Sequence, residues 1–131
     1  SGTEVRAYEV AEGDRMTVLN ADLAGTTAID CQSCTLELSE CVTLTSSSGV
    51  TLTLAINTPM TLPGGRWEIA ANMGNRPVAV LDNGEFRWET VVKVEYAGKM
   101  PVAKISCHNA TFAAGDQPGR YIFSHNAVNK P

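Results

Sequence analysis

The chain has 131 residues and a formal net charge of −4, and its ten Lys and Arg residues are scattered rather than clustered. Binding to a phosphate backbone needs clustered basic residues, so the sequence argues against a nucleic-acid partner. No apolar run approaches the roughly 18 residues that span a bilayer, so we expect no membrane span. Charged residues make up only 18% of the chain, below the usual quarter or so, which is typical of extracellular proteins and assembly subunits.

The N-terminal third reads as short strands separated by small polar residues. Residues 5–10 alternate apolar and polar side chains and predict a first strand, and residues 15–19 predict a second. Residues 23–34 are small and polar, so we expect irregular chain there, or a weak strand around residues 26–29. Residues 35–39 predict a strand with Leu36 and Leu38 pointing inward, leading into a central hairpin.

Residues 41–65 carry no charged side chain and form the most pronounced feature of the sequence. Aliphatic residues occupy even positions: Val42, Leu44, Val50, Leu52, Leu54 and Ile56. Threonines occupy odd positions and are interface candidates: Thr43, Thr45, Thr51 and Thr53. This period of two predicts two strands joined by a loop at residues 46–49. Such an uncharged hairpin would be prone to edge pairing if left open, so we expect its own domain or another chain to cover it.

Turn residues divide the following part of the chain into further strands. Prolines and glycines at residues 59–65 mark a connection, and residues 66–70 predict a strand with Trp67 and Ile69 on one side. Residues 78–81 predict the next strand. The Asn-Gly pair that follows favours a tight hairpin, because both central residues of a type I′ turn need positive φ.

The longest alternating run covers residues 86–96. Its even positions predict a buried face, namely Phe86, Trp88, Thr90, Val92, Val94 and Tyr96, and its odd positions a solvated one. Residues 97–99 then predict a turn into a strand over residues 102–107. A loop at residues 115–119 precedes a last strand over residues 121–124.

Strands recur every eight to twelve residues and no window shows sustained helical spacing. The sequence therefore predicts an all-β fold, an antiparallel sandwich or jelly-roll-like barrel of about eight to ten strands with little or no helix. We expect a single domain over residues 1–131, with residues 1–10 as a strand that a neighbouring subunit could receive. Val5 and Val10 are interface candidates in that strand.

Four cysteines, Cys31, Cys34, Cys41 and Cys107, are the only conspicuous set of reactive residues. Two disulfides are the favoured interpretation, one local and one from this group to Cys107, which would require an oxidising compartment. A zinc site formed by the cysteines with His108 is an alternative, although its second ligand pair is distant in sequence. A redox Cys-x-x-Cys motif is the least favoured, because no helix follows Cys34. Free buried thiols are the remaining interpretation.

No other residues form a defensible catalytic set. Cys107 and His108 adjoin at a strand end and point to opposite faces, and His125 is interpreted as a solvated tail residue. The acidic residues read as a solvated surface, and a carboxylate-based hydrolase is the best-supported catalytic alternative. We therefore expect a protein that is not an enzyme and has no cofactor.

Function is predicted from the surface rather than from a site. The uncharged hairpin favours a structural subunit that associates with copies of itself or with a larger protein shell, in a virus particle or an extracellular fibre. The alternative is a secreted, disulfide-stapled carbohydrate-binding module with an aromatic platform. Its aromatic candidates are Trp67, Trp88, Tyr96, Tyr121 and Phe123. Either role implies an extracellular or virion-surface location.

Overall fold

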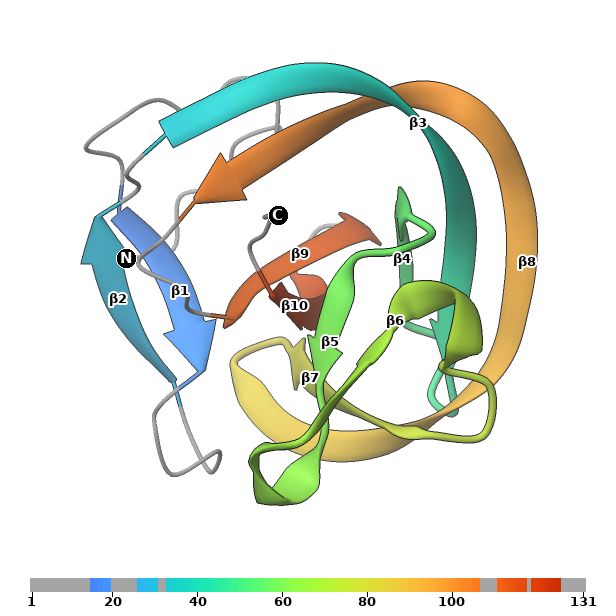
Figure 1. The fold of residues 1–131 in the computed structure, drawn as a ribbon. Coiled ribbons are helices and arrows are strands. Elements are labelled where there is room, and N and C mark those ends of the chain that lie inside the picture. Colours follow the sequence, from blue (N-terminus) through green and yellow to red (C-terminus); the bar gives the residue numbers. More distant parts are fainter. Residues whose placement is uncertain (1–14, 20–25, 31–32, 107–110, 118, 126–131) are drawn as a thin grey trace.

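The computed structural model of the chain describes residues 15–19, 26–30, 33–106, 111–117 and 119–125. These residues form an all-β fold, as the sequence predicts, and its strands curl into a nearly closed, barrel-like shape (Figure 1). The strands are β1 (Arg15–Leu19), β2 (Thr26–Asp30), β3 (Ser33–Ser46), β4 (Thr51–Ala55), β5 (Pro59–Thr61), β6 (Trp67–Ile69), β7 (Pro77–Asp82), β8 (Glu85–Ser106), β9 (Thr111–Gln117) and β10 (Arg120–His125). Two single turns of 3₁₀ helix, η2 (Pro63–Gly65) and η3 (Ala70–Asn72), flank β6. Within this described part, no helix is long and apolar enough to cross a membrane.

Eight strands form one antiparallel sheet in the order β2-β1-β9-β10-β7-β8-β3-β4, and β5 pairs with β6 separately. The outer strand β4 packs against β9 and β10, which brings one edge of the sheet back toward its middle. The long strands β3 and β8 form a ribbon that arches over the molecule (Figure 1). One curled sheet, rather than two separate stacked sheets, therefore surrounds the core.

The central hairpin forms as predicted. β3 and β4 pair with Thr43 opposite Thr53, and residues 47–49 make the connection. The aliphatic face is buried, with Leu44 fully inaccessible to solvent. The chain's own domain thus covers this hairpin, and its burial needs no second chain.

β8 departs from the predicted alternation because it contains two bulges. Thr45 pairs with Lys93 but Ser46 pairs with Val91, so Val92 is an extra residue and is 58% exposed. One inserted residue exchanges the faces of a strand. The expected single buried face is therefore wrong: Val91 is buried in the main core and Val94 packs against that core from the other side of the bulge.

The second bulge replaces the turn predicted at residues 97–99. Cys41 pairs with Gly98 and Val42 with Tyr96, which leaves Ala97 unpaired in the register. Gly98 has a φ of +92°, a conformation that glycine adopts without steric cost. The chain bends here and continues as the same strand, because β3 supplies a partner on both sides of the bulge.

Among the described residues, two apolar clusters lie on opposite faces of the middle of the sheet. The main core contains thirteen buried residues: Val42, Leu44, Val50, Leu52, Leu54, Met60, Leu62, Ala70, Met73, Val78, Val80, Val91 and Ile122. The second cluster has Ala79 and Phe123 buried, with Leu81, Phe86 and Trp88 packed against them. Neighbours in sequence therefore alternate between two buried faces, which explains the unbroken apolar run in β7.

Other expectations need correction. Leu38 is 66% exposed, so it does not point inward as expected. β9 extends to Gln117, which shortens the predicted loop at residues 115–119. The Asn-Gly hairpin between β7 and β8 is confirmed, with positive φ at Asn83 and Gly84.

Candidate functional site

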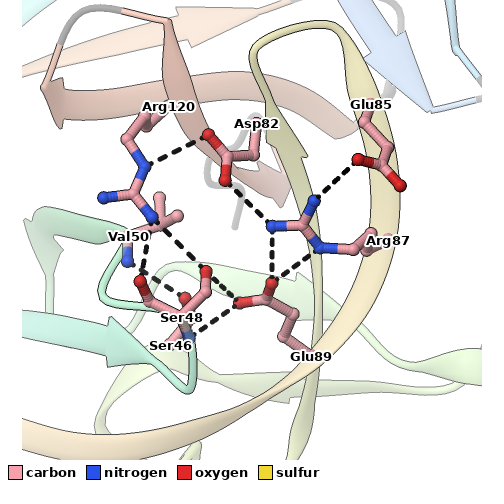
Figure 2. Close-up of polar contacts among 8 residues, drawn as sticks. All are labelled: Ser46, Ser48, Val50, Asp82, Glu85, Arg87, Glu89 and Arg120. Carbon is pink, nitrogen blue, oxygen red and sulfur yellow. Dashed lines mark hydrogen bonds and ion pairs between the residues drawn. The ribbon is translucent and has the colours of Figure 1, made fainter.

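The densest polar arrangement in the described residues joins four parts of the fold (Figure 2). We call it the turn clamp and define it as Ser48, Asp82, Arg87, Glu89 and Arg120. Ser48 lies in the turn between β3 and β4, Asp82 ends β7, Arg87 and Glu89 lie early in β8, and Arg120 starts β10. The clamp therefore connects elements far apart in sequence.

Hydrogen bonds close the turn clamp into a loop of five residues. Arg120 Nε donates to Asp82 Oδ1 at 3.1 Å, and Arg87 Nη2 donates to Asp82 Oδ2 at 2.9 Å. Arg87 Nε donates to Glu89 Oε2 at 2.9 Å, and Ser48 Oγ donates to Glu89 Oε1 at 2.8 Å. Arg120 Nη2 returns to the Ser48 carbonyl oxygen at 2.9 Å. The charged groups of the turn clamp thus face one another.

Both carboxylates of the clamp are held in their charged forms. Burial of Glu89, whose side chain is 8% exposed, would raise its pKa, but hydrogen bonds from Ser46, Ser48 and Arg87 lower the pKa overall. The hydrogen bond from Arg87 lowers the pKa of Asp82, and Arg120 adds to that effect. These carboxylates serve as fixed acceptors at neutral pH, so the clamp favours a structural role over proton transfer.

A second group of reactive residues lies at the far end of β10. Ser124 is 4% exposed and pairs with Phe112, and the backbone of His125 pairs with Thr111 on β9. β10 also packs against β4 and β5. The sequence continues with Asn126. A buried hydroxyl, an imidazole and a carboxamide thus follow one another along the chain.

His125 was interpreted from the sequence as a solvated tail residue, and this is wrong for its backbone, which belongs to a paired strand. The signal that could have found it is the apolar run of residues 121–123, which continues through Ser124 without a breaker into the His-Asn pair. Nothing local predicts that β4, β5 and β9 would meet β10, because those contacts arise only when the sheet curls.

The cysteines expected to form disulfides are only partly described. Cys41 is a free, fully buried thiol whose Sγ lies 3.4 Å from the Ser39 carbonyl oxygen, so a disulfide at Cys41 is wrong. Burial, followed by the charge of Glu40, raises the pKa of the Cys41 thiol. Cys34 lies on β3 opposite Ile105. Cys31, Cys107 and His108 lie outside the described residues, and zinc binding by this group stays a prediction.

The interface candidates lie on one face of the central hairpin. Thr43 and Thr53 are opposite each other with their Oγ1 atoms 2.7 Å apart, and Thr45 pairs with Thr51. Threonine pairs of this kind stabilise a sheet within one chain. Val5 and Val10 lie outside the described residues.

The aromatic residues expected to form a platform are separated. Phe86 contacts Trp88 and Phe123 edge to face, with ring centroids 6.1 and 5.9 Å apart. Tyr96 is exposed and donates a hydrogen bond to Glu40, whereas Trp67 lies on β6. Phe86, Trp88 and Phe123 pack together in the second apolar cluster.

Comparison with known proteins identifies the fold. No protein-family model matches the sequence, and no curated protein is similar to it in sequence. The DnaB intein of Synechocystis sp. PCC 6803 is similar in structure, with a TM-score of 0.83, 14% identity, and coverage of 98% of this chain and 90% of that one. An intein-like domain from Clostridium thermocellum has a TM-score of 0.71 at 14% identity, covering 93% and 88% of the two chains. The TvoVMA intein has a TM-score of 0.72 at 16% identity, covering 88% and 71%.

These similarities show that the chain has the fold of inteins, and they correct the expected function. The three structures are protein-splicing or intein-like domains, so the structural coat or fibre subunit and the carbohydrate-binding module are both wrong. The homo-oligomer and the disulfides expected for those roles are therefore wrong as well. The expectation of a protein without catalytic activity is also contradicted, because inteins cleave and join their own polypeptide. The predicted location, and the predicted lack of nucleic-acid binding, stay predictions.

Proposed function

We propose that this chain is a self-processing domain of the protein-splicing type, which cleaves a peptide bond of its own polypeptide. The observation that carries the proposal is the mutual coverage with the Synechocystis DnaB intein, 98% of this chain and 90% of that one at a TM-score of 0.83. The likeness thus extends over nearly a whole splicing domain and is not confined to a shared motif. At 14% identity, this likeness supports the activity only through the shared fold. The chemistry must therefore be argued from this chain's own residues.

The residues at and directly after the end of β10 in the sequence supply a cleavage chemistry. An asparagine can attack its own backbone carbonyl carbon through the side-chain amide nitrogen, forming a cyclic imide as the peptide bond to the next residue breaks. The proton lost by the amide nitrogen balances the proton gained by the departing amine. Here the sequence places Asn126 directly after His125, and an imidazole can donate and accept protons near neutral pH. We assign cleavage to the bond between Asn126 and Ala127.

The described residues before Asn126 favour this reaction by limiting the motion of the chain that leads to it. Ser124 is buried and β10 pairs with β9 up to His125, so the backbone that leads to Asn126 has a fixed direction. Holding a nucleophile near its target is worth a large part of a reaction barrier. A solvated tail would lack this advantage.

The test is a fusion of the chain between two unrelated reporter domains, incubated under reducing conditions and followed by intact mass. We expect a fragment ending at Asn126 in its cyclic imide form, and no such fragment from Asn126→Ala. Asn72→Ala is the matched control, because Asn72 is an exposed asparagine whose amide binds only Glu68 in the described contacts. An unprocessed wild-type fusion after long incubation would contradict the proposal. A ligated product of the two reporters would extend it from cleavage to splicing.

A further inference from the structure

The strand that carries the proposed site is held unevenly along its length. Only Arg120, Tyr121 and Ile122 of β10 pair with β7, and the remaining residues up to His125 pair with β9 alone. The end of the strand therefore depends on one neighbour for its hydrogen bonds. Its position must be fixed from the other end or through the core.

The pairing with β9 is also irregular near Arg120. Arg120 pairs with Gln117 but Ile122 pairs with Ala114, so β9 contains one residue more than β10 between these pairs. Gly115 lies in this bulge, and a Cβ atom there would be 2.3 Å from the Arg120 carbonyl oxygen. A bulge sets the register of the strands that follow it, so the register of His125 is decided beside Arg120.

Hydrophobic burial gives little help in choosing that register. Ile122 lies in the main core and Phe123 in the second cluster, and both are at most 1% exposed. A strand with one buried face rejects a slip of one residue, because the slip would expose its apolar side chains. β10 is apolar toward both faces at these positions, so a slip exchanges one buried residue for another.

Arg120 can select one register of β10, which the apolar pattern does not. Its guanidinium is fixed by Asp82 on β7 and by the Ser48 carbonyl in the β3–β4 turn. Asp82 is itself held by Arg87, and Arg87 by Glu89, which binds Ser48 (Figure 2). A slip of one residue moves a strand by roughly 3.3 Å, which exceeds the tolerance of such directional bonds. Polar groups of this kind can specify register at little gain in stability.

We propose that Arg120 is a positioning residue and that the turn clamp fixes the register of β10 up to His125, the residue that precedes the proposed cleavage site in the sequence. The proposal rests on the proposed function for its catalytic consequence. Its structural consequence, a single register of β10, is independent of any activity. The two consequences are tested by different measurements.

The experiment uses the reporter fusion and three variants of the chain. Arg120→Ala removes the guanidinium, and Arg120→Lys keeps the charge but has one compact donor group in place of the planar fork. Arg76→Ala is the matched control, because Arg76 also forms an ion pair, with Glu68 at 3.1 Å, but lies outside the turn clamp. Each variant is measured for the cleavage rate constant, for melting temperature, and for amide hydrogen exchange at residues 122–125.

Arg120→Ala should slow cleavage about tenfold or more and speed amide exchange at residues 122–125 by a similar factor, while the protein remains folded. Arg120→Lys should recover part of both losses, and Arg76→Ala should match the wild type within about twofold. Wild-type cleavage and exchange in a folded Arg120→Ala would overturn the proposal. If Arg120→Ala does not fold, Glu89→Gln opens the same loop from β8 and should give the same two effects, and wild-type values there would overturn it. If the wild type does not cleave, the proposed function fails. The amide-exchange rates of Arg120→Ala and the wild type then test the proposal about the register by themselves.

Discussion

The two halves of the β3–β8 ribbon have the same pairing but different surroundings. Beside β4, Val42 and Leu44 are buried in the main core. Beyond the bulge at Gly98, residues 33–40 continue to pair with β8, yet Leu38 is 66% exposed. Regular hydrogen bonding is therefore no sign of a buried strand. Among the described residues, what separates Leu44 from Leu38 is that the main core packs against the first and not the second.

The largest expected contrast between the halves comes from truncating one leucine in each. Leu44→Ala should lower the free energy of unfolding by about 2–5 kcal/mol, because it removes a fully buried side chain and leaves a cavity. Leu38→Ala should change it by no more than about 0.5 kcal/mol. Urea denaturation measures both. Equal effects would show that the outer half is covered after all.

The bulge between the halves should be the next most sensitive position. Gly98→Ala should cost about 1–2 kcal/mol, because φ is +92° and a Cβ meets no atom within 4 Å, so the cost is backbone strain alone. Gly74→Ala is the control, since its φ lies outside the left-handed region and the nearest atom, Val94 Cγ2, is at an ordinary 3.9 Å. The same denaturation experiment applies. A neutral Gly98→Ala would mean that the chain relaxes into a different bend.

Acid should loosen the inner half, where the turn clamp holds the β3–β4 turn. The pKa values of Asp82 and Glu89 are lowered in the folded protein, so each contributes stability that is present above its unfolded pKa, near 4. That stability is lost as the pH falls below 4 through the folded pKa values. When the melting temperature is measured between pH 6 and pH 2, it should decrease below pH 4. The fall should be shallower in Glu89→Gln, and an identical fall would exclude Glu89 from the acid response.

The smallest effect is expected at alkaline pH from Cys41, at the boundary of the two halves. Its pKa is raised in the folded protein, so folding favours the thiol, and the stability this gives is lost as the pH rises through the folded pKa. Alkylation at Cys41 should be slow in the native protein and fast after unfolding, because the thiol is fully buried. Peptide mass mapping distinguishes Cys41 from the other cysteines. Rapid native labelling at Cys41 would show that the bulge opens.

Some strand positions followed from the sequence alone, although the turn predicted around Gly98 is a bulge within β8. β1, the central hairpin and the Asn-Gly turn before β8 lie where they were predicted, because side-chain period and turn chemistry are local properties. The faces of β8 could not be predicted in the same way. Val92 and Ala97 are inserted relative to β3, and an insertion is defined only by the partner strand.

The sequence by itself determined the all-β class, the central hairpin and the Asn-Gly turn, since these depend on neighbouring residues. Only the tertiary structure decided that Leu38 is exposed, that Cys41 is a buried free thiol, and that His125 ends a paired strand. The candidate site belongs to this second group. It requires the sheet to curl until β4 and β5 reach β10, and that closure depends on contacts between residues far apart in the chain. A period of two indicates which residues share a face of one strand, but it contains no information about what packs against that face.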